Sequence, residues 1–396
     1  MSRPEDVPQA PAEPPARHTG RDAAAAPGGT VPRPGPAETE VLVRAVITAT
    51  APPQGPGALQ DVLLRALCPV MTGHQVPPGP LEPVTLAELK RTLDAGHRDT
   101  EFRTWVALML IVNEVILSPL TDDITARVAE WVAGVGAPDG LVALARSLKD
   151  GDPWAALIEF ERACGYRPLR RDHEGRPLDT VEALSAAWRP CFDDARLAAR
   201  WEALAGCPPG SLGLAVHRYF LARGFPFPGR PGSTPAYLTQ HDWVHVVADY
   251  GTTLTTELEV FSLVTRALLD RRGFELLAWV VGLHLIGYTG LAAAQFAARR
   301  GPVSKEGMAV RVRDALRRGA LVRTDLLSVD WFALADQPLD KVRADLGVVP
   351  KSAAALTAGA AGPFEPGGLD TYQVEAGRRM AAAAGRPYAM YGAAPE

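Results

Sequence analysis

Cysteine is scarce in this chain, and the few copies it has are far apart. Cys68, Cys164, Cys191 and Cys207 form no CxxC pair and no zinc-ribbon spacing, so a cysteine-based zinc ribbon is excluded. We expect these cysteines to be reduced core thiols of a cytoplasmic protein.

An excess of positive charge is also missing. The chain carries 41 basic and 45 acidic residues, a formal net charge of −4, which leaves no electrostatic footprint for nucleic acid. Its first 20 residues hold no apolar run of the kind that starts a secretion signal. We therefore expect no nucleic-acid partner and no secretion.

Strand-like alternation is rare, whereas amphipathic helical patterns recur. With 396 residues, 47% of them hydrophobic, the chain is long enough for two folded domains. Apolar residues at three- and four-residue spacings predict an all-α protein that begins with a helical bundle of unknown role over residues 39–150. Its His74, His97 and Glu114 are scattered, and surface or capping roles are predicted for them. The helical patterns cover residues 41–49, 59–71, 85–93, 101–117 and 122–135.

Proline-rich, charged and alanine-rich stretches divide the rest of the chain. Residues 1–38 contain nine prolines and are predicted to be a disordered tail, because they cannot bury enough apolar surface to fold. Residues 151–184 mix a helix with a charged loop and are predicted to be a linker. Residues 353–396 are rich in Ala, Gly and Pro and are predicted to be a flexible tail that can form one short helix.

The most informative pattern is a group of imidazoles and carboxylates near residue 245. At 3.6 residues per turn, His241, Asp242, His245 and Asp249 fall within roughly 100° of one helix face. Four potential ligands therefore point the same way. Glu257 follows twelve residues after His245.

Glu257 and Glu259 cannot both belong to one site, because residues two apart on a helix face different directions. Gly251 is expected to break the first helix, and Thr256 with Glu259 has the spacing of a capping box that starts a second one. Glu259 is then expected on a solvated face.

Glu257 is expected on the opposite, apolar side of that second helix. It shares a stripe with Phe261 and Val264, which should be buried. A carboxylate buried there costs several kcal/mol unless it is paired or bound to a cation.

Two imidazoles with one or two carboxylates favour zinc, iron or manganese over calcium or magnesium, because nitrogen donors suit the borderline metals. We predict a divalent metal, zinc first, held by His241, His245 and Glu257. Asp242 is either a fourth ligand or the group that fixes an imidazole tautomer, and it is also the catalytic candidate. The alternative without a metal is that the two histidines cap or ion-pair with the carboxylates inside a helical hairpin.

The same residues resemble a known family. The string HDxxH followed after eleven residues by Glu, filled here by His241, Asp242, His245 and Glu257, is the signature of the coenzyme Q biosynthesis protein 4 family. The flanking segments CPPGSLGLAVHRYFLARGFPFPG and VDWFALADQPLDKVRADLGVVP also resemble that family. The resemblance covers residues 185–350, and it predicts a second domain over residues 185–352.

The resemblance implies an all-helical domain that binds a divalent metal and a polyprenyl-aromatic lipid. Members of that family act in ubiquinone synthesis at the membrane surface. They are linked to replacing the ring carboxyl of a prenylated hydroxybenzoate by a hydroxyl, an oxidative decarboxylation, and to organising other quinone-biosynthesis enzymes. Peripheral contact with the inner face of the membrane stays open for this chain.

One long apolar run follows the motif. Nineteen residues from Leu276 to Ala294 carry no charged side chain, which is near the minimum length of a membrane span. The run includes His284 and three glycines, so a buried central helix fits better than a span. Given the resemblance, this helix is expected to line the pocket for the prenyl tail.

Two other functions stay open. HDxxH differs from the metallopeptidase HExxH by one methylene at the carboxylate, so one alternative is a metal-dependent hydrolase with Asp242 as general base. The other is a non-catalytic lipid-binding scaffold with a structural metal. An open metal site would favour catalysis, and four closed protein ligands would favour a structural role.

Overall fold

The chain is helical throughout the part that the structure, a computed structural model, describes. The described residues are 33–76, 79–117, 120–137, 140–150, 193–233, 239–267 and 306–388. All regular elements in these ranges are helices and none is a strand, which confirms the all-α fold. The predicted linker, the predicted apolar helix at 276–294, Cys164 and Cys191 lie outside the described residues.

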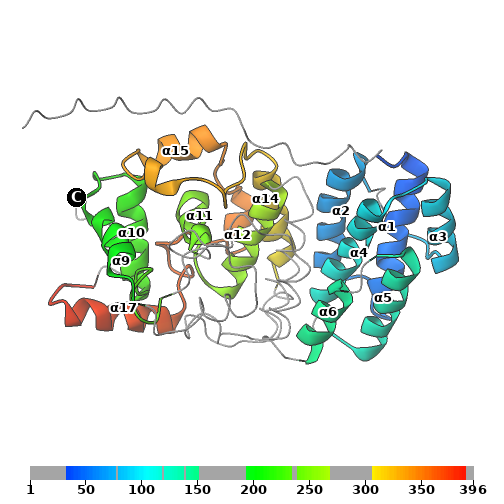
Figure 1. Cartoon of the computed structure of the whole chain (residues 1–396), viewed down its shortest axis with the longest axis horizontal. Helices are drawn as coiled ribbons and strands as arrows, with labels where there is room; N and C mark the ends of the chain where they lie inside the picture. The colour runs from blue at the N-terminus through cyan, green and yellow to red at the C-terminus, as the bar shows by residue number, and fades with distance from the viewer. Residues whose placement is uncertain are drawn as a thin grey trace, which may run out of the picture. The chain divides into compact units, whose positions relative to one another are not determined.

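The N-terminal bundle is built around one central helix, α4 (Figure 1). All residues of α4 from Val106 to Val115 are buried, as expected for a helix that is apolar on nearly every side. Helix α4 contacts α1, α2, α5 and α6. The helices of this part are α1 (Pro36–Thr50), α2 (Ala58–Thr72), α3 (Leu86–Ala95), α4 (Thr100–Val115), α5 (Asp122–Val135) and α6 (Gly140–Asp150).

These helices confirm the five helical patterns, with two differences. Helix α1 begins at Pro36, inside the predicted disordered tail, because proline fits the first position of a helix, where its missing N–H costs nothing. Helix α6 was not predicted. The histidines agree with expectation, since His97 is exposed and His74 is half-buried.

The predicted surface or capping role of Glu114 is wrong. Glu114 is 1% exposed, and neither of its carboxylate oxygens has a well-aligned hydrogen-bond partner among the described residues, although Thr125 is near enough to lower its pKa in part. Burial raises the pKa of this carboxyl to about 8. The physical reason is the position of α4, because its second half, from Val106 to Val115, is surrounded by other helices and has no face that reaches solvent.

The C-terminal part surrounds α11 and α12, which carry the predicted metal motif (Figure 1). Helix α12 packs against α14, and α10 packs against both α11 and α17. The helices are α9 (Ala195–Glu202), α10 (Leu212–Arg223), α11 (Gln240–Ala248), α12 (Leu254–Ala267), α14 (Met308–Gly319), α15 (Leu339–Leu346), α16 (Ala353–Thr357) and α17 (Thr371–Ala383), with the 3₁₀ turns η2 (Ala203–Gly206) and η5 (Trp331–Leu334).

Local sequence signals set the ends of α10, which lies beside the motif. The Ser211 hydroxyl accepts a hydrogen bond from the backbone N–H of Leu214 at 3.3 Å, a standard N-cap. Gly224 ends the helix in the left-handed conformation, with φ 64°, which glycine adopts at little cost.

An aromatic cluster packs against one side of α11. The ring of Trp243 lies 5.4 Å from that of Trp201 and 5.2 Å from that of Phe332. It also stacks on Trp331, at 6.2 Å and an interplanar angle of 6°. Trp243 is 1% exposed, so this cluster fixes the rotation of α11 about its axis.

Residues 360–363, 368, 373 and 377 are buried, which corrects the prediction of a flexible tail over this part of the chain. Helix α17 contacts α10 so closely that a Cβ added at Gly377 would lie 2.4 Å from the carbonyl oxygen of Ala222. The Tyr388 hydroxyl donates to the same carbonyl at 2.7 Å. The small residues that suggested flexibility instead allow two helices to touch. The short terminal helix that the sequence allowed is present as α17.

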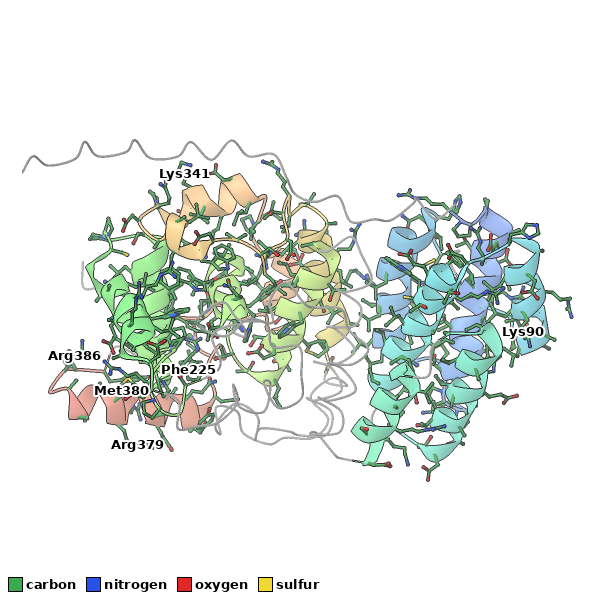
Figure 2. The ribbon with its side chains drawn as sticks, viewed as in Figure 1. Lys90, Phe225, Lys341, Arg379, Met380 and Arg386 are labelled. Atoms are coloured by element: carbon green, nitrogen blue, oxygen red, sulfur yellow. The ribbon has the colours of Figure 1, made fainter. Side chains whose placement is uncertain are left out.

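Charged side chains lie on the outer faces of several helices, for example Lys90 of α3 and Lys341 of α15 (Figure 2). Among the described residues, no helix has the length and apolar character needed to cross a membrane.

Candidate metal site

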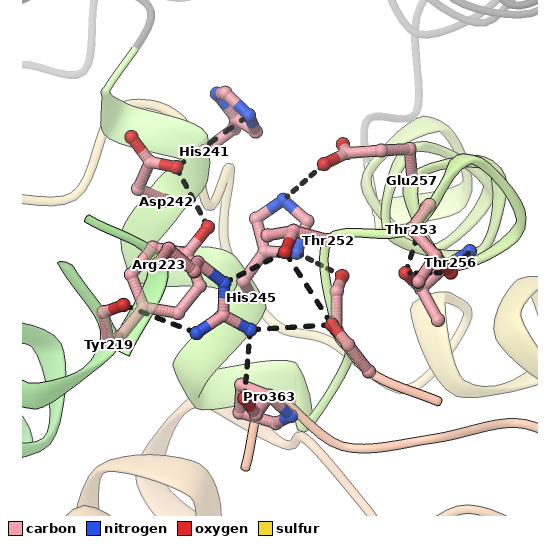
Figure 3. Close-up of polar contacts among 12 residues, drawn as sticks. Tyr219, Arg223, His241, Asp242, His245, Thr252, Thr253, Thr256, Glu257 and Pro363 are labelled. Atoms are coloured by element: carbon pink, nitrogen blue, oxygen red, sulfur yellow. Dashed lines mark hydrogen bonds and ion pairs between the residues drawn. The ribbon is translucent and has the colours of Figure 1, made fainter. Parts of the chain in front are cut away.

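Helix α11 carries three of the predicted site residues (Figure 3). Asp242 and His245 are buried, and the side chain of His241 is 18% exposed. His241 and His245 face α12, where they meet Phe261 and Glu257, whereas the carboxylate of Asp242 reaches Tyr219 of α10.

His241, Asp242 and His245 form a compact group. One ligand atom from each lies within 4.8 Å of the others, and the Nε2 of His241 is 3.9 Å from the Oδ1 of Asp242. Two ligand atoms on one metal at 2.0–2.2 Å are roughly 3–4 Å apart. A small closure would therefore bring these atoms to bonding distance, and the group could hold a metal ion.

Glu257 approaches His245 from α12. Its Oε1 lies 3.2 Å from the Nε2 of His245, although Nε2 has no partner with the alignment of a hydrogen bond among the described residues. Glu257 is 2% exposed, and Phe261 and Val264 of the same stripe are buried as predicted. The structure therefore brings Glu257 to His245 but outside the compact group of three, and its role as a ligand stays a prediction.

The predicted solvated face for Glu259 is wrong. Glu259 is fully buried, and its Oε2 accepts a hydrogen bond from Nη2 of Arg311 at 2.5 Å, because α14 covers this side of α12. The predicted capping box is wrong too, since α12 starts before Thr256. The hydroxyl of Thr253 instead accepts from the N–H of Thr256 at 3.4 Å.

Asp249 does not share the helix face with the two histidines. Helix α11 ends at Ala248, and Asp249 adopts the left-handed conformation, with φ 59° and ψ 49°. Its carboxylate lies 2.6 Å from the Nζ of Lys351. The prediction treated the helix as running through Asp249, and the left-handed turn redirects this side chain.

The imidazole of His245 is held in one tautomer by a backbone carbonyl. Its Nδ1 lies 2.8 Å from the carbonyl oxygen of Gly251, and because a carbonyl can only accept, Nδ1 carries the proton. In neutral His245 the lone pair of Nε2 then points toward Glu257. Burial lowers the pKa of His245, but the charges of Glu257 and Asp242 outweigh it and hold the pKa above its usual value.

Asp242 is oriented by Tyr219 of α10. The Tyr219 hydroxyl donates to Oδ1 of Asp242 at 2.9 Å, and burial raises the pKa of Tyr219 well above its usual value, so it remains a donor. Burial also raises the pKa of Asp242, opposed by the charges of His241 and His245. Asp242 was predicted to be a fourth ligand or the group that fixes an imidazole tautomer, and for His245 the second role belongs to the carbonyl of Gly251.

Tyr219 and Arg223 were not predicted from the sequence. The guanidinium carbon of Arg223 lies 4.0 Å from the centre of the Tyr219 ring, and Arg223 is fully buried. Burial lowers the pKa of Arg223 to about 10, so it keeps its charge at neutral pH. The available signal was their four-residue spacing on a helix face that also contains Val216 and Phe220.

The chemistry of the donor set fits a borderline divalent metal. It combines two imidazole nitrogens with a carboxylate, and the buried Nε2 of His245 lacks a well-aligned hydrogen-bond partner among the described residues. A buried polar atom in that condition is destabilising unless something compensates it. Either of two arrangements would supply the compensation: an ion pair of protonated His245 with Glu257, 3.2 Å away, or a metal ion bound to both side chains.

The fold and the site thus define an all-α protein whose described part contains a His/Asp/His group able to hold a metal ion. No family model matches the chain, and no curated protein matches it. Among solved structures, the chain is similar to a Nostoc punctiforme PCC 73102 protein described as a "Putative ubiquinone biosynthesis protein". The identity is 18% and the TM-score 0.28, over 63% of this chain and 98% of that chain.

Proposed function

We propose that this chain is a metal-dependent protein of quinone biosynthesis. In this proposal, His241, Asp242, His245 and Glu257 hold one divalent metal, with zinc as the first candidate. The ligand is a polyprenylated hydroxybenzoate-type precursor with its aromatic head near the metal. The protein works in the cytoplasm, in peripheral contact with the membrane and with other enzymes of the same route.

The observation that carries the metal assignment is the convergence of ligand atoms from two helices on His245. The α11 residues lie within 4.8 Å of one another, and Glu257 of α12 reaches within 3.2 Å of the same imidazole. Two acidic side chains buried beside two histidines gain most from a cation, because the desolvation of each carboxylate is then offset. The quinone-precursor part rests on the HDxxH and Glu signature with its flanking segments.

The degree of burial favours a site that a ligand can reach. Asp242, His245 and Glu257 are buried, whereas the side chain of His241 is 18% exposed. The described residues therefore leave one edge of the group accessible, beside His241. A reacting carboxylate or phenolate would approach from this edge.

The chain's own residues prepare the site. Gly251 fixes the tautomer of His245, and Tyr219 fixes the carboxylate of Asp242. When bound, a divalent metal supplies a Lewis acid that polarises a ligand oxygen. In the enzymatic form of the proposal, the ring carboxyl leaves as CO₂, an oxygen atom from water enters as the hydroxyl, and dioxygen takes up the two electrons and two protons released, forming hydrogen peroxide. Iron would suit that oxidation better, because zinc has no redox chemistry.

Metal analysis of the purified protein tests the metal assignment. We expect about one divalent metal per chain in the wild type and its loss in the His245→Ala variant, with circular dichroism used to confirm that the variant is folded. His97→Asn is the matched control, because His97 is exposed and has φ 50°, a conformation that asparagine tolerates. Stoichiometric metal in folded His245→Ala protein would contradict the assignment.

Extraction of the same preparation with organic solvent tests the ligand class. Burial of a prenyl tail contributes about 0.8 kcal/mol per methylene group, so a lipid of a few isoprene units should stay bound through purification. Added polyprenyl-hydroxybenzoate should raise the melting temperature, since a ligand at 100 times its Kd stabilises by about 2.7 kcal/mol. Absence of lipid together with an unchanged melting temperature would leave the quinone-precursor proposal without support.

A turnover assay distinguishes an enzyme from the alternative, a non-catalytic lipid-binding scaffold. A precursor labelled with ¹³C at the ring carboxyl should release ¹³CO₂ if the protein is an enzyme. Metal and lipid bound without any release, with zinc or iron loaded and an oxidant present, would favour the scaffold.

A further inference from the structure

The contacts that orient Asp242 and His245 lead to the same part of the chain, the segment Ala361–Gln373, which follows α16 and ends in the first turn of α17. We propose that Arg223 and this segment are a positioning element for the metal site, and this inference rests on the function proposed above. The segment lies beyond residue 352, where the sequence predicted a flexible tail that can form one short helix.

The first line of contact runs from His245 through Gly251. The carbonyl of Gly251 holds Nδ1 of His245, while the N–H of Gly251 donates to the carbonyl of Ala361 at 3.0 Å. The N–H of the next residue, Thr252, donates to the carbonyl of Gly368 at 2.8 Å. The peptide that orients His245 is therefore hydrogen-bonded on both sides to the segment.

Glycines allow this contact. A Cβ added at Gly251 would lie 2.3 Å from the Cα of Gly368, and one added at Gly368 would lie 1.9 Å from the carbonyl oxygen of Gly362. Real Cβ contacts are not that short, so a side chain at either position would move the backbone. The position of the Gly251 carbonyl thus depends on the close backbone contact of Gly251, Gly368 and Gly362.

The second line of contact runs from Asp242 through Tyr219 to Arg223. The Arg223 guanidinium stacks on the Tyr219 ring, donates from Nε to the Thr252 hydroxyl at 2.7 Å, and donates from Nη2 to the carbonyl of Pro363 at 2.8 Å (Figure 3). Arginine suits this place because its planar group can stack and donate in two directions at once.

The two sets of contacts, one from His245 and one from Asp242, meet at Thr252. Its hydroxyl accepts from Arg223 and donates to the side-chain oxygen of Gln373 at 2.9 Å. Gln373 and Arg223 are fully buried. A single buried network therefore joins both orienting contacts, so a change in Arg223 or in the segment should alter two ligands together.

Two variants test the proposal in the full-length protein. Arg223→Lys keeps the charge but loses the planar, two-way donor, and Gly368→Ala forces the segment away from Gly362. The matched controls are Arg379→Lys and Gly385→Asn. Arg379 is exposed on α17 (Figure 2), and Gly385 has open space and a φ of 62°, which asparagine accepts.

Cobalt(II) is the probe of the metal site. We expect both variants, once shown to be folded by circular dichroism, to bind cobalt 10- to 100-fold more weakly than the wild type, as for other residues that orient metal ligands. Their visible absorption bands should also change, whereas the controls should match the wild type. Wild-type affinity and bands in both folded variants would overturn the proposal.

The tautomer of His245 gives a readout that requires no metal. Ring ¹⁵N chemical shifts of labelled histidine, recorded at a pH high enough to make His245 neutral and assigned by comparison with His245→Gln, should show the proton on Nδ1 in the metal-free wild type. A mixture of the two neutral tautomers is expected in Arg223→Lys and Gly368→Ala. If neither variant folds, the wild type decides, because a neutral His245 that carries its single proton on Nε2 and not on Nδ1 would overturn the proposal. A wild type that binds no metal but shows the Nδ1-protonated tautomer, lost in the variants, would contradict the proposed function while leaving this orienting network in place.

Discussion

Replacing Glu114 with Gln should make the stability of the N-terminal bundle less dependent on pH. Burial raises the pKa of Glu114 from an ordinary 4.5 to about 8. The folded state therefore binds this proton more tightly than the unfolded state does. The stability that the protonated form of Glu114 contributes is fully present below pH 4.5 and is lost progressively as the pH rises to 8.

The linkage relation gives the size of the effect. With those two pKa values, the ionisation of Glu114 lowers the free energy of unfolding by about 1 kcal/mol at pH 5 and about 3 kcal/mol at pH 7. Glutamine has nearly the same shape and does not ionise. The stability of Glu114→Gln relative to the wild type should therefore increase by about 2.5 kcal/mol between pH 5 and pH 7, whatever constant cost the buried amide adds.

Urea titrations at pH 5, 6 and 7 measure this increase. Brief deuterium labelling of peptides from α4 after each titration step reads the bundle separately from the rest of the chain. Glu101→Gln is the control, because Glu101 is an exposed carboxylate in the first turn of the same helix. A difference between Glu114→Gln and wild type that stays constant across these pH values, within about 0.5 kcal/mol, would refute the reasoning.

Three further predictions concern the C-terminal part. Tyr219→Phe removes the donor to Asp242 and should weaken metal binding about 10-fold by chelator competition, and an unchanged affinity would show that this contact is dispensable. Arg311→Met leaves the charge of Glu259 buried without its partner and should lower the free energy of unfolding in urea by about 3–5 kcal/mol. The double variant Arg311→Met with Glu259→Gln should recover most of that loss, and no recovery would contradict a stabilising role for the Arg311–Glu259 ion pair. Metal affinity should fall as the pH drops, because a proton on Nε2 of His245 competes with the metal. The fall should begin above the pH at which an ordinary histidine titrates, since the pKa of His245 is raised. An affinity that does not change with pH would contradict the assignment of His245 as a ligand.

The fold was largely predictable because its signals are local. Apolar spacing marked five of the bundle helices, and a residue such as Ser211 marks a helix start without any tertiary information. Glu114 could not be placed this way, because its burial depends on how many helices surround α4 and not on α4 itself. The same applies to Gly377, whose role in a helix contact depends on the distant Ala222.

The site was predictable where one helix supplies the residues. His241, Asp242 and His245 are close in sequence, so helix geometry alone brings them together. Glu259 was misplaced because its partner, Arg311, is 52 residues away. Arg223 was missed for the same reason, since its contact with Pro363 spans 140 residues.

The near-parallel stacking of Trp243 on Trp331 gives the molecule a built-in optical signal. Two indoles 6.2 Å apart with planes inclined by 6° are close enough for their electronic transitions to couple, which should produce a paired band in the circular dichroism spectrum. Trp243 is the immediate neighbour of Asp242 in α11. Any shift of α11 when the histidine face takes up a ligand would therefore change the intensity of that band, so the binding of colourless ions and lipids could be followed without an added label.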